Sequence, residues 1–225
     1  MKKLLIFDAY GTLLSTGKGS LEATKKILAL QEKEIDPTIF YKDWKKYHRK
    51  HLDEANASKF ILEKEIFAKD LEALYEQYQI NRPHEKDVEI MLESLIGRVV
   101  FPEVAEAIRE LRKKYRVVIG STTDTGPLLV NLKNNGLEVD AVYTSEMIQK
   151  YKPDPMFYQY ILQAEGYKAE DAVFIGDSLV DDIEGPQRVG ITTILVDRNE
   201  QFIQTGDVCP NYIVRGIREI VELEL

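Results

Sequence analysis

The sequence predicts an α/β protein: a doubly wound, mostly parallel sheet with an all-helical domain inserted after its first strand. Short, almost continuously apolar runs recur in residues 1–15 and 100–225, and amphipathic helical segments alternate with them. Such runs are typical of parallel strands covered on both faces, and the alternation is typical of doubly wound folds. No strand pattern occurs between residues 20 and 97, which predicts the insertion.

Six apolar runs are the expected strands of this sheet. They lie at residues 4–7, 117–120, 141–143, 172–175, 193–196 and 212–214. The expected helices between them are marked by proline at the start and glycine at the end. Pro127 opens a helix that stops at Gly136, and Pro155 opens another that stops near Gly166. This asymmetry is common at helix ends, so each strand is expected to be followed by a helix that returns the chain.

The helical insertion is marked by an apolar stripe at helical spacing and by flanking glycines. The stripe comprises Phe67, Leu71, Leu74, Tyr75 and Tyr78. Gly17, Gly19 and Gly97 are plausible hinge positions on either side. We therefore expect a core formed by residues 1–16 and 98–225 and a helical domain formed by residues 17–97.

Composition and charge narrow the functional classes. The chain has 225 residues and a formal net charge of −8, which argues against general binding to nucleic acid or anionic membranes. The N-terminal apolar run stops at Asp8, so we expect a core strand there rather than a leader or membrane span. A single cysteine, Cys209, fits a reducing cytosol. We expect a cytoplasmic protein, monomeric or homodimeric, whose partner is a small anionic substrate.

Polar side chains follow four of the expected strands at the edge where doubly wound sheets bind ligands. Each is alone an ordinary cap, turn or loop residue, but their succession along the chain indicates a site. They are Asp8 after the first strand, Ser121 and Thr122 after the second, Lys152 beyond the third, and Asp177, Asp181 and Asp182 after the fourth.

This succession resembles the haloacid dehalogenase superfamily of hydrolases. The similarity covers residues 1–15 and about 100–200, and rests on FDAYGTL at 7–13, Ser121, Lys152 before Pro153, and GDSLVDD at 176–182. The resemblance implies a Rossmann-like core with strand order 5-4-1-2-3. It also implies that the insertion is the helical cap, which closes over the site and excludes water.

The resemblance also implies roles for individual residues. Asp8 would be the covalent nucleophile, an accepted role for carboxylates. The cofactor would be Mg²⁺, which prefers hard oxygen ligands. The implied metal ligands are Asp8, the backbone carbonyl of Tyr10, Asp177 and Asp182, with Asp181 next to them. The implied substrate-binding groups are Ala9, Ser121, Thr122 and Lys152.

Tyr10 departs from the phosphatase pattern, which has a second Asp there as general acid and base. Tyr has an ordinary pKa of about 10 and is a poor acid at neutral pH. The Ala9-Tyr10 pair instead resembles the L-2-haloacid dehalogenase branch, which needs neither acid nor metal. The acidic residues at 177, 181 and 182 favour a metal, because adjacent carboxylates repel one another without a cation.

We therefore expect a Mg²⁺-dependent phosphatase of small phosphorylated metabolites, acting through an aspartyl-phosphate at Asp8 with a weakened general acid at Tyr10. Three alternatives stay open. One is a metal-independent 2-haloacid dehalogenase, another is a phosphonate-cleaving relative, and the third is a binding or regulatory protein with little turnover. In the insertion, His48 and His51 lie at i and i+3 and could share a ligand, although packing of an amphipathic helix is the more economical interpretation.

Overall fold

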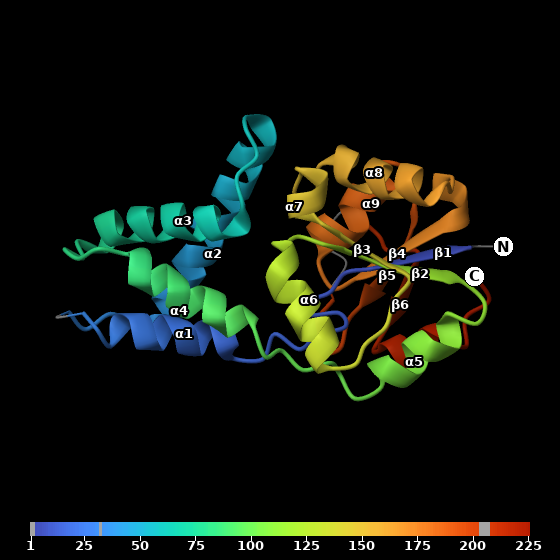
Figure 1. The fold of residues 1–225 in the computed structure, drawn as a ribbon, viewed down its shortest axis with the longest axis horizontal. Helices are drawn as coiled ribbons and strands as arrows, with labels where there is room; N and C mark the ends of the chain where they lie inside the picture. Colours follow the sequence, from blue (N-terminus) through green and yellow to red (C-terminus); the bar gives the residue numbers. More distant parts are fainter. Residues whose placement is uncertain (1–2, 32, 203–207) are drawn as a thin grey trace. The chain divides into compact units, whose positions relative to one another are not determined.

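The computed structural model divides the chain into two compact units (Figure 1). The sheet unit comprises Met1–Ser15 and Val99–Leu225, and the helical unit comprises Thr16–Arg98. The residues that the structure describes are 3–31, 33–202 and 208–225.

A six-stranded sheet forms the centre of the first unit, and the predicted fold class is confirmed. Its order is β3-β2-β1-β4-β5-β6, and all five neighbouring pairs are parallel. The expected order 5-4-1-2-3 is therefore present, with one more strand beside β5. The strands are β1 Leu4–Phe7, β2 Arg116–Ser121, β3 Ala141–Thr144, β4 Ala172–Gly176, β5 Thr192–Val196 and β6 Tyr212–Val214.

Helices separate the first five strands, as the alternating pattern predicts, and one follows β6, whereas the described residues between β5 and β6 contain no helix. They are α5 Val104–Leu111, α6 Thr125–Asn134, α7 Ser145–Ile148, α8 Pro155–Glu165, α9 Gly185–Gln187 and α10 Ile217–Ile220, with a 3₁₀ turn η1 Ala169–Asp171 and a π-helix η2 Leu179–Glu184. Helix α6 begins two residues before Pro127, because the carboxylate of Glu146 accepts the backbone N–H of Thr125, which would otherwise be unpaired at the helix start.

The sheet is covered on both faces because alternate residues of each strand point to opposite sides. In β1, Leu5 and Phe7 join a core with side chains of α5, α6 and α10. Leu4 and Ile6 join a second core with side chains of α8. All four β1 side chains are fully buried, so the central strand holds the residue that follows it, Asp8, in a fixed position.

The helical unit contains four helices around its own apolar core, and no strand is found among its described residues. The predicted stripe from Phe67 to Tyr78 lies in this core, where Phe67 and Phe40 pack against Trp44. Asp36 caps the second helix by accepting the backbone N–H groups of Thr38 and Ile39. The helices are α1 Gly19–Leu28, α2 Pro37–Ala57, α3 Glu63–Tyr78 and α4 Glu85–Leu95.

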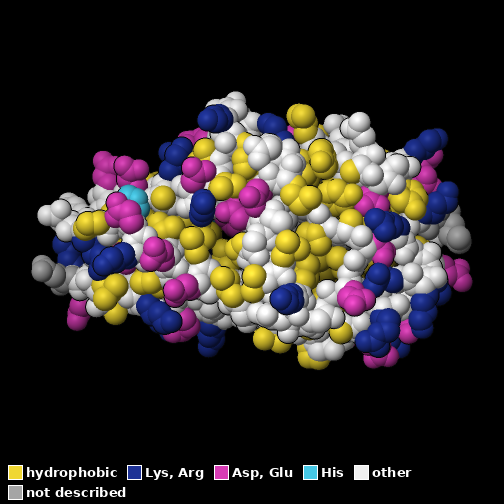
Figure 2. Space-filling view, in the orientation of Figure 1, with side chains coloured by type: hydrophobic (Ala, Val, Ile, Leu, Met, Phe, Trp, Pro, Cys, Tyr) yellow, Lys and Arg dark blue, Asp and Glu magenta, His cyan; other side chains and the backbone are white. Residues whose placement is uncertain are grey.

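Charged side chains of both signs are mixed on one face of the molecule. On the face shown in Figure 2, Lys and Arg side chains are interspersed with Asp and Glu rather than gathered into one basic patch. Among the residues that the structure describes, no helix has the length and apolar character needed to span a membrane.

Candidate active site

Four predicted site residues meet at the carboxyl edge of the sheet around one ammonium group. Lys152 Nζ lies 2.7 Å from Asp8 Oδ1 and 2.7 Å from Asp182 Oδ1. Ser121 Oγ donates to Asp8 Oδ1 at 3.4 Å. Asp8 keeps 6% of its surface exposed, and the other three keep 2% or less. Residues separated by up to 174 positions in sequence therefore form one buried, charged cluster.

A cavity of about 190 Å³ opens onto this cluster. Its lining contains every side chain that the sequence assigned to catalysis or metal binding. The lining residues are Asp8, Tyr10, Ser121, Thr122, Lys152, Asp177, Ser178, Asp181 and Asp182. Thr122 Oγ1 is buried there and makes no hydrogen bond to any described residue, which leaves it available to a substrate oxygen.

The turn after β1 holds Asp8 next to Asp177. The backbone N–H of Asp8 donates to the Ile175 carbonyl at 2.8 Å, which continues the pairing of β1 with β4. Gly11 has φ +98°, and a Cβ on it would lie 2.4 Å from Asp177 Oδ2. Thr12 Oγ1 donates to Asp177 Oδ1 at 3.0 Å. Glycine at position 11 is thus required both by the left-handed backbone and by the close approach of the carboxylate.

The π-helix η2 returns Asp182 to the end of β4. Its first turn is capped by Ser178, whose hydroxyl accepts the backbone N–H of Asp181 at 3.2 Å. The backbone N–H of Ser178 in turn donates to Asp182 Oδ2 at 2.9 Å. A Cβ on Gly176 would lie 2.2 Å from Asp182 Cγ. Single π turns are frequent at functional sites, and here the turn brings a carboxylate against the strand end.

Burial and charge act together on the ionisable groups of this cluster. Burial raises the pKa of Asp8 and of Asp182, and Lys152 offsets this only in part. Burial alone would lower the pKa of Lys152, but the charges of Asp182 and Asp8 outweigh it and raise that pKa. Burial also raises the pKa of Asp177, and the negative charge of Asp182 raises it further. One ammonium therefore does not balance the carboxylates around it.

A divalent cation would balance the excess negative charge of these carboxylates. One carboxylate oxygen from each of Asp8, Asp177 and Asp182 lies within 4.8 Å of the others. Three carboxylates against one ammonium leave an excess of negative charge, and oxygen donors of this kind are those that Mg²⁺ prefers. The donor set matches three of the four ligands that the family resemblance implies, the fourth being a backbone carbonyl.

Tyr10 lines the cavity, and its phenol contacts helix α6. Asn131 Nδ2 donates to Tyr10 Oη at 3.2 Å, and Asn131 is fully buried. Of the two adjacent acids, Asp182 is the one that contacts Lys152. The backbone carbonyl of Asp181 instead accepts the hydroxyl of Tyr158 at 2.5 Å.

Sequence reasoning did not single out four residues that support the site: Thr12, Ser178, Tyr158 and Asn131. Thr12 and Ser178 lie inside the motifs quoted above, so their proximity to Asp8 and Asp177 was the available signal. Tyr158 is fully buried, and its hydroxyl donates to the backbone of the π-helix. Nothing in the sequence pattern pairs Asn131 with Tyr10.

The two histidines of the helical unit belong to a separate cluster. His48 Nδ1 and His51 Nδ1 each lie 2.7 Å from the carboxylate of Asp70, and Trp44 Nε1 donates to it at 3.0 Å. Asp70 is fully buried on α3. These contacts join α2 to α3, which agrees with the packing interpretation of the two histidines.

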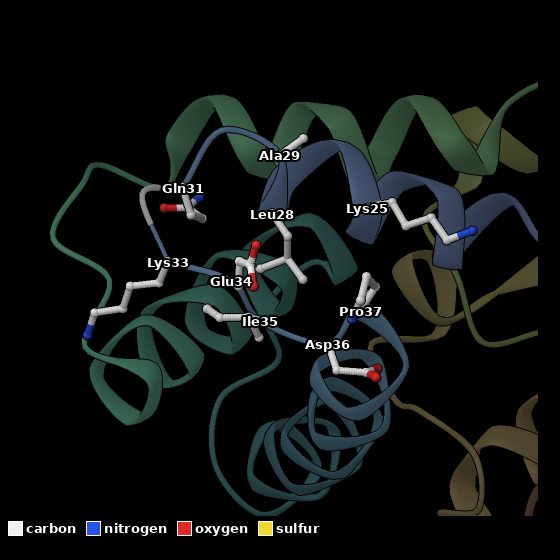
Figure 3. A pocket seen from close by; sticks show the side chains of 9 residues that line it. All are labelled: Lys25, Leu28, Ala29, Gln31, Lys33, Glu34, Ile35, Asp36 and Pro37. Carbon is white, nitrogen blue, oxygen red and sulfur yellow. The ribbon is translucent and has the colours of Figure 1, made fainter.

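A larger cavity of about 660 Å³ lies between the end of α1 and the start of α2 (Figure 3). The side chains of Leu28 and Ile35 face it, whereas those of Lys25 and Lys33 point outward. Its lining contains none of the residues that the sequence analysis assigned to catalysis, substrate or metal binding, so the smaller cavity at Asp8 is the candidate active site.

The fold and the cluster together define a hydrolase-type site: a carboxylate at the end of a central parallel strand, beside a lysine and two further acids. The family model described as haloacid dehalogenase-like hydrolase matches residues 2–190. The chain therefore belongs to this family of hydrolases, and the resemblance inferred from its motifs is confirmed.

Relatives of known name include both phosphatases and dehalogenases. A glyceraldehyde 3-phosphate phosphatase of Methanopyrus kandleri is 23% identical over 99% of this chain and 97% of its own length. A pyrimidine 5'-nucleotidase, PynA, of Streptococcus pneumoniae is 46% identical over 36% of this chain and 34% of its own. The solved L-2-haloacid dehalogenase of Xanthobacter autotrophicus superposes with a TM-score of 0.81 at 17% identity, over 99% of this chain and 98% of its own.

These similarities support the fold and family more broadly than any one activity. Matches to the first curated relatives cover 46%, 37% and 43% of those proteins' own lengths. The structural likeness, at 17% identity, shows the fold alone.

Proposed function

We propose that this protein is a Mg²⁺-dependent phosphatase of small phosphorylated metabolites that acts through an aspartyl-phosphate at Asp8. The observation that carries the proposal is the set of three carboxylates, Asp8, Asp177 and Asp182, within 4.8 Å of one another beside a single buried lysine. Displacement of halide needs no such excess of negative charge, whereas hydrolysis of a phosphate with a bound cation does.

In the first step, a carboxylate oxygen of Asp8 attacks phosphorus, the bond to the leaving oxygen breaks, and its electron pair leaves with the alcohol or acid. Ser121 Oγ and Lys152 Nζ both contact Asp8 Oδ1, so they hold that oxygen and direct the other toward substrate. In the second step, water hydrolyses the phosphoryl–Asp8 anhydride and restores the carboxylate. Asp8, Asp177 and Asp182 would hold Mg²⁺, which when bound would offer positive charge to the phosphoryl oxygens.

The residue at position 10 determines which phosphates react well. The Tyr10 hydroxyl accepts a hydrogen bond from Asn131, and a phenol is a weak acid at neutral pH. Loss of a positioned general acid typically costs on the order of 10²–10⁴ in rate. Acyl and aryl phosphates, whose leaving groups need little protonation, are therefore the preferred substrates. The helical unit, Thr16–Arg98, acts as the cap that selects among them, in a cytoplasmic monomer or homodimer.

A metal-independent 2-haloacid dehalogenase is the second candidate, favoured by Tyr10 in place of the phosphatase Asp. In that reaction Asp8 would attack the carbon that bears the halogen, halide would leave with its bonding electrons, and water would hydrolyse the ester. The acidic residues 177 and 182 would then lack a function. A binding or regulatory role with little turnover is the third candidate. No contact among the described site residues directly supports it.

The test is phosphate release from acetyl phosphate and from an aryl phosphate, with Mg²⁺ and with EDTA. We expect activity that EDTA abolishes and added Mg²⁺ restores. Asp177→Asn should remove nearly all of it. Asp171→Asn is the matched control, because the side chain of Asp171 forms a long, 3.7 Å ion pair with Lys3 outside the site.

Three other results would contradict the proposal. Full phosphatase activity in EDTA would exclude the metal-dependent reaction. Chloride release from L-2-chloropropionate that is unaffected by EDTA and by Asp177→Asn would establish the dehalogenase instead. No turnover on either class of substrate, with ligand binding retained, would favour the binding protein.

A further inference from the structure

Arg198 lies directly beyond β5, outside the residues matched by the family model, and contacts the turn that carries the nucleophile. Its Nη2 donates to the backbone carbonyl of Thr12 at 2.8 Å. The side chain is 18% exposed. An arginine that is mostly buried and bonded to the backbone of a catalytic turn can fix the geometry of that turn.

The guanidinium is itself held from two sides. Its Cζ lies 3.6 Å from the centroid of the Phe101 ring, and its Nη1 donates to Glu103 Oε1 at 2.6 Å. A lysine ammonium can also pair with a carboxylate, but the planar, forked guanidinium can stack on an aromatic face while separate nitrogens donate to a carboxylate and to a carbonyl. Burial alone would raise the pKa of Glu103, but backbone N–H groups and Arg198 outweigh it and lower that pKa, so Glu103 stays charged at neutral pH.

Thr12 links Arg198 to the candidate cation site. Its carbonyl accepts from Arg198 while its hydroxyl donates to Asp177 Oδ1 at 3.0 Å. Thr12 is fully buried. The carboxylate of Asp177 occupies the space that a Cβ on the neighbouring Gly11 would take, since such a Cβ would lie 2.4 Å from its Oδ2, so Asp177 packs directly against the turn. The position of Asp177 therefore depends on the position of the turn.

We propose that Arg198 is a positioning residue for the cation site, acting through Thr12 on the carboxylate of Asp177. This inference rests on the proposed function, because it concerns the affinity for Mg²⁺. Groups that orient a metal ligand typically change metal affinity by 10- to 100-fold when they are removed. Arg198 would orient the metal ligand Asp177 in this way, with Thr12 between them.

The experiment is a calorimetric titration of Mg²⁺ into the metal-free full-length protein and its variants. Arg198→Lys keeps the charge but loses the fork and the stacking, and we expect its Mg²⁺ dissociation constant to rise about tenfold. Arg215→Gln is the control, because Arg215 pairs with Glu200 at 2.8 Å with 70% of its side chain exposed. The control should bind Mg²⁺ like the wild type.

A second pair of variants tests the link through Thr12. Thr12→Val has the same shape without the hydroxyl and should weaken Mg²⁺ binding as Arg198→Lys does, whereas Thr12→Ser should retain most of the affinity. If both residues act on Asp177 by one route, the double variant Arg198→Lys with Thr12→Val should lose less than the product of the two single losses.

Thermal unfolding in EDTA separates positioning from stability. Variants that are less stable but bind Mg²⁺ with wild-type affinity would overturn the proposal for Arg198, and so would additive effects of the two substitutions. If Arg198→Lys does not fold, the Thr12 pair still decides, since wild-type affinity in Thr12→Val would overturn the link.

The wild-type titration keeps this failure distinct from that of the proposed function. Absence of Mg²⁺ binding by the wild type would overturn both. Binding that Asp177→Asn removes and Arg198→Lys leaves unchanged would overturn only the role of Arg198.

Discussion

Two buried carboxylate clusters, one in each unit, solve the problem of burying charge in different ways. In the helical unit, Asp70 is surrounded by three ring nitrogens, from Trp44, His48 and His51, at 3.0, 2.7 and 2.7 Å. As a carboxylate, Asp70 can only accept, so each Nδ1 is assigned the proton. In the sheet unit, Asp8 and Asp182 share one ammonium group, that of Lys152.

The difference indicates which cluster is built for stability and which for chemistry. A buried charge with a full set of donors stabilises its surroundings, whereas carboxylates in excess of their donors oppose folding. Burial raises the pKa of Asp8, Asp177 and Asp182, and a neighbouring carboxylate raises each of them further. Such perturbed groups around a cavity are typical of functional sites.

The largest expected effect is on activity at Asp8. Asp8→Asn removes the nucleophile, so we expect a loss of hydrolysis on the order of 10⁴-fold or more, as for other covalent catalysts. Stability should change little, because the loss of one bond to Lys152 is offset by relief of repulsion among carboxylates. Initial rates and urea unfolding measure the two effects. If Asp8→Asn lost much stability but kept substantial activity, the cluster at Asp8 would be the structural one.

The opposite outcome is expected at Asp70. Asp70→Asn presents an NH₂ group to histidine N–H donors and removes the buried charge that they solvate, so the free energy of unfolding should fall by about 3 kcal/mol. Asp53→Asn, on α2, is the control, because its side chain is 58% exposed and 4.0 Å from Arg49. Urea unfolding of both variants tests this. Equal stability of Asp70→Asn and wild type would show that the cluster is not a structural one.

The fold was largely predictable because its signals are local. Apolar runs located all six strands, and proline–glycine punctuation located both ends of α8, since strand burial and helix ends depend on neighbouring residues. The start of α6 was predicted two residues too late. The π-helix η2 was not predicted. Its geometry depends on Tyr158 and on the absence of a Cβ at Gly185, where a Cβ would lie 2.2 Å from the Tyr158 hydroxyl, and these are contacts between distant segments.

The site was predictable only for residues inside recognisable motifs. The structure brings Asp8, Ser121, Lys152 and Asp182 into contact, and the strand ends had placed them at one edge. Arg198 carries no local signal, because its importance comes from Thr12, 186 positions away. Side chains that act through packing and single hydrogen bonds across the fold leave no periodic trace in the sequence.

Gly176 tests whether the acid cluster tolerates displacement. A Cβ there would lie 2.2 Å from Asp182 Cγ, so Gly176→Ala should shift that carboxylate and lower activity by about 10²-fold, the cost of misplacing a catalytic group by 1 Å. Gly126→Ala is the matched control, because Gly126 lies in α6 with nothing within 4 Å of its would-be Cβ. The control should be as active as wild type and slightly more stable. Wild-type activity in Gly176→Ala would show that the cluster adjusts freely.

The smallest effect is expected at Asp140, a partly exposed carboxylate that lies outside both clusters and has its own hydrogen-bond donors. Asp140 accepts the backbone N–H of Val117 at 2.8 Å and the guanidinium of Arg112 at 2.9 Å. Burial alone would raise the pKa of Asp140, but these donors outweigh it and lower the pKa. A carboxyl whose folded pKa is below its ordinary value of about 3.9 stabilises fully above that pH and loses its contribution as pH falls through the folded pKa.

Asp140→Asn should therefore cost less than about 1 kcal/mol at pH 7, since solvent screens a partly exposed pair. The difference from wild type should shrink as the pH falls below 4. Urea unfolding between pH 7 and pH 3 measures this. Glu138→Gln is the control, because Glu138 contacts the same arginine at 3.5 Å but is 87% exposed, and its difference should stay near zero throughout. If the difference in unfolding free energy between Asp140→Asn and wild type stays constant with pH, Val117 and Arg112 stabilise the amide as well as the carboxylate. The contribution of Asp140 would then come from the geometry of its hydrogen bonds and not from its charge.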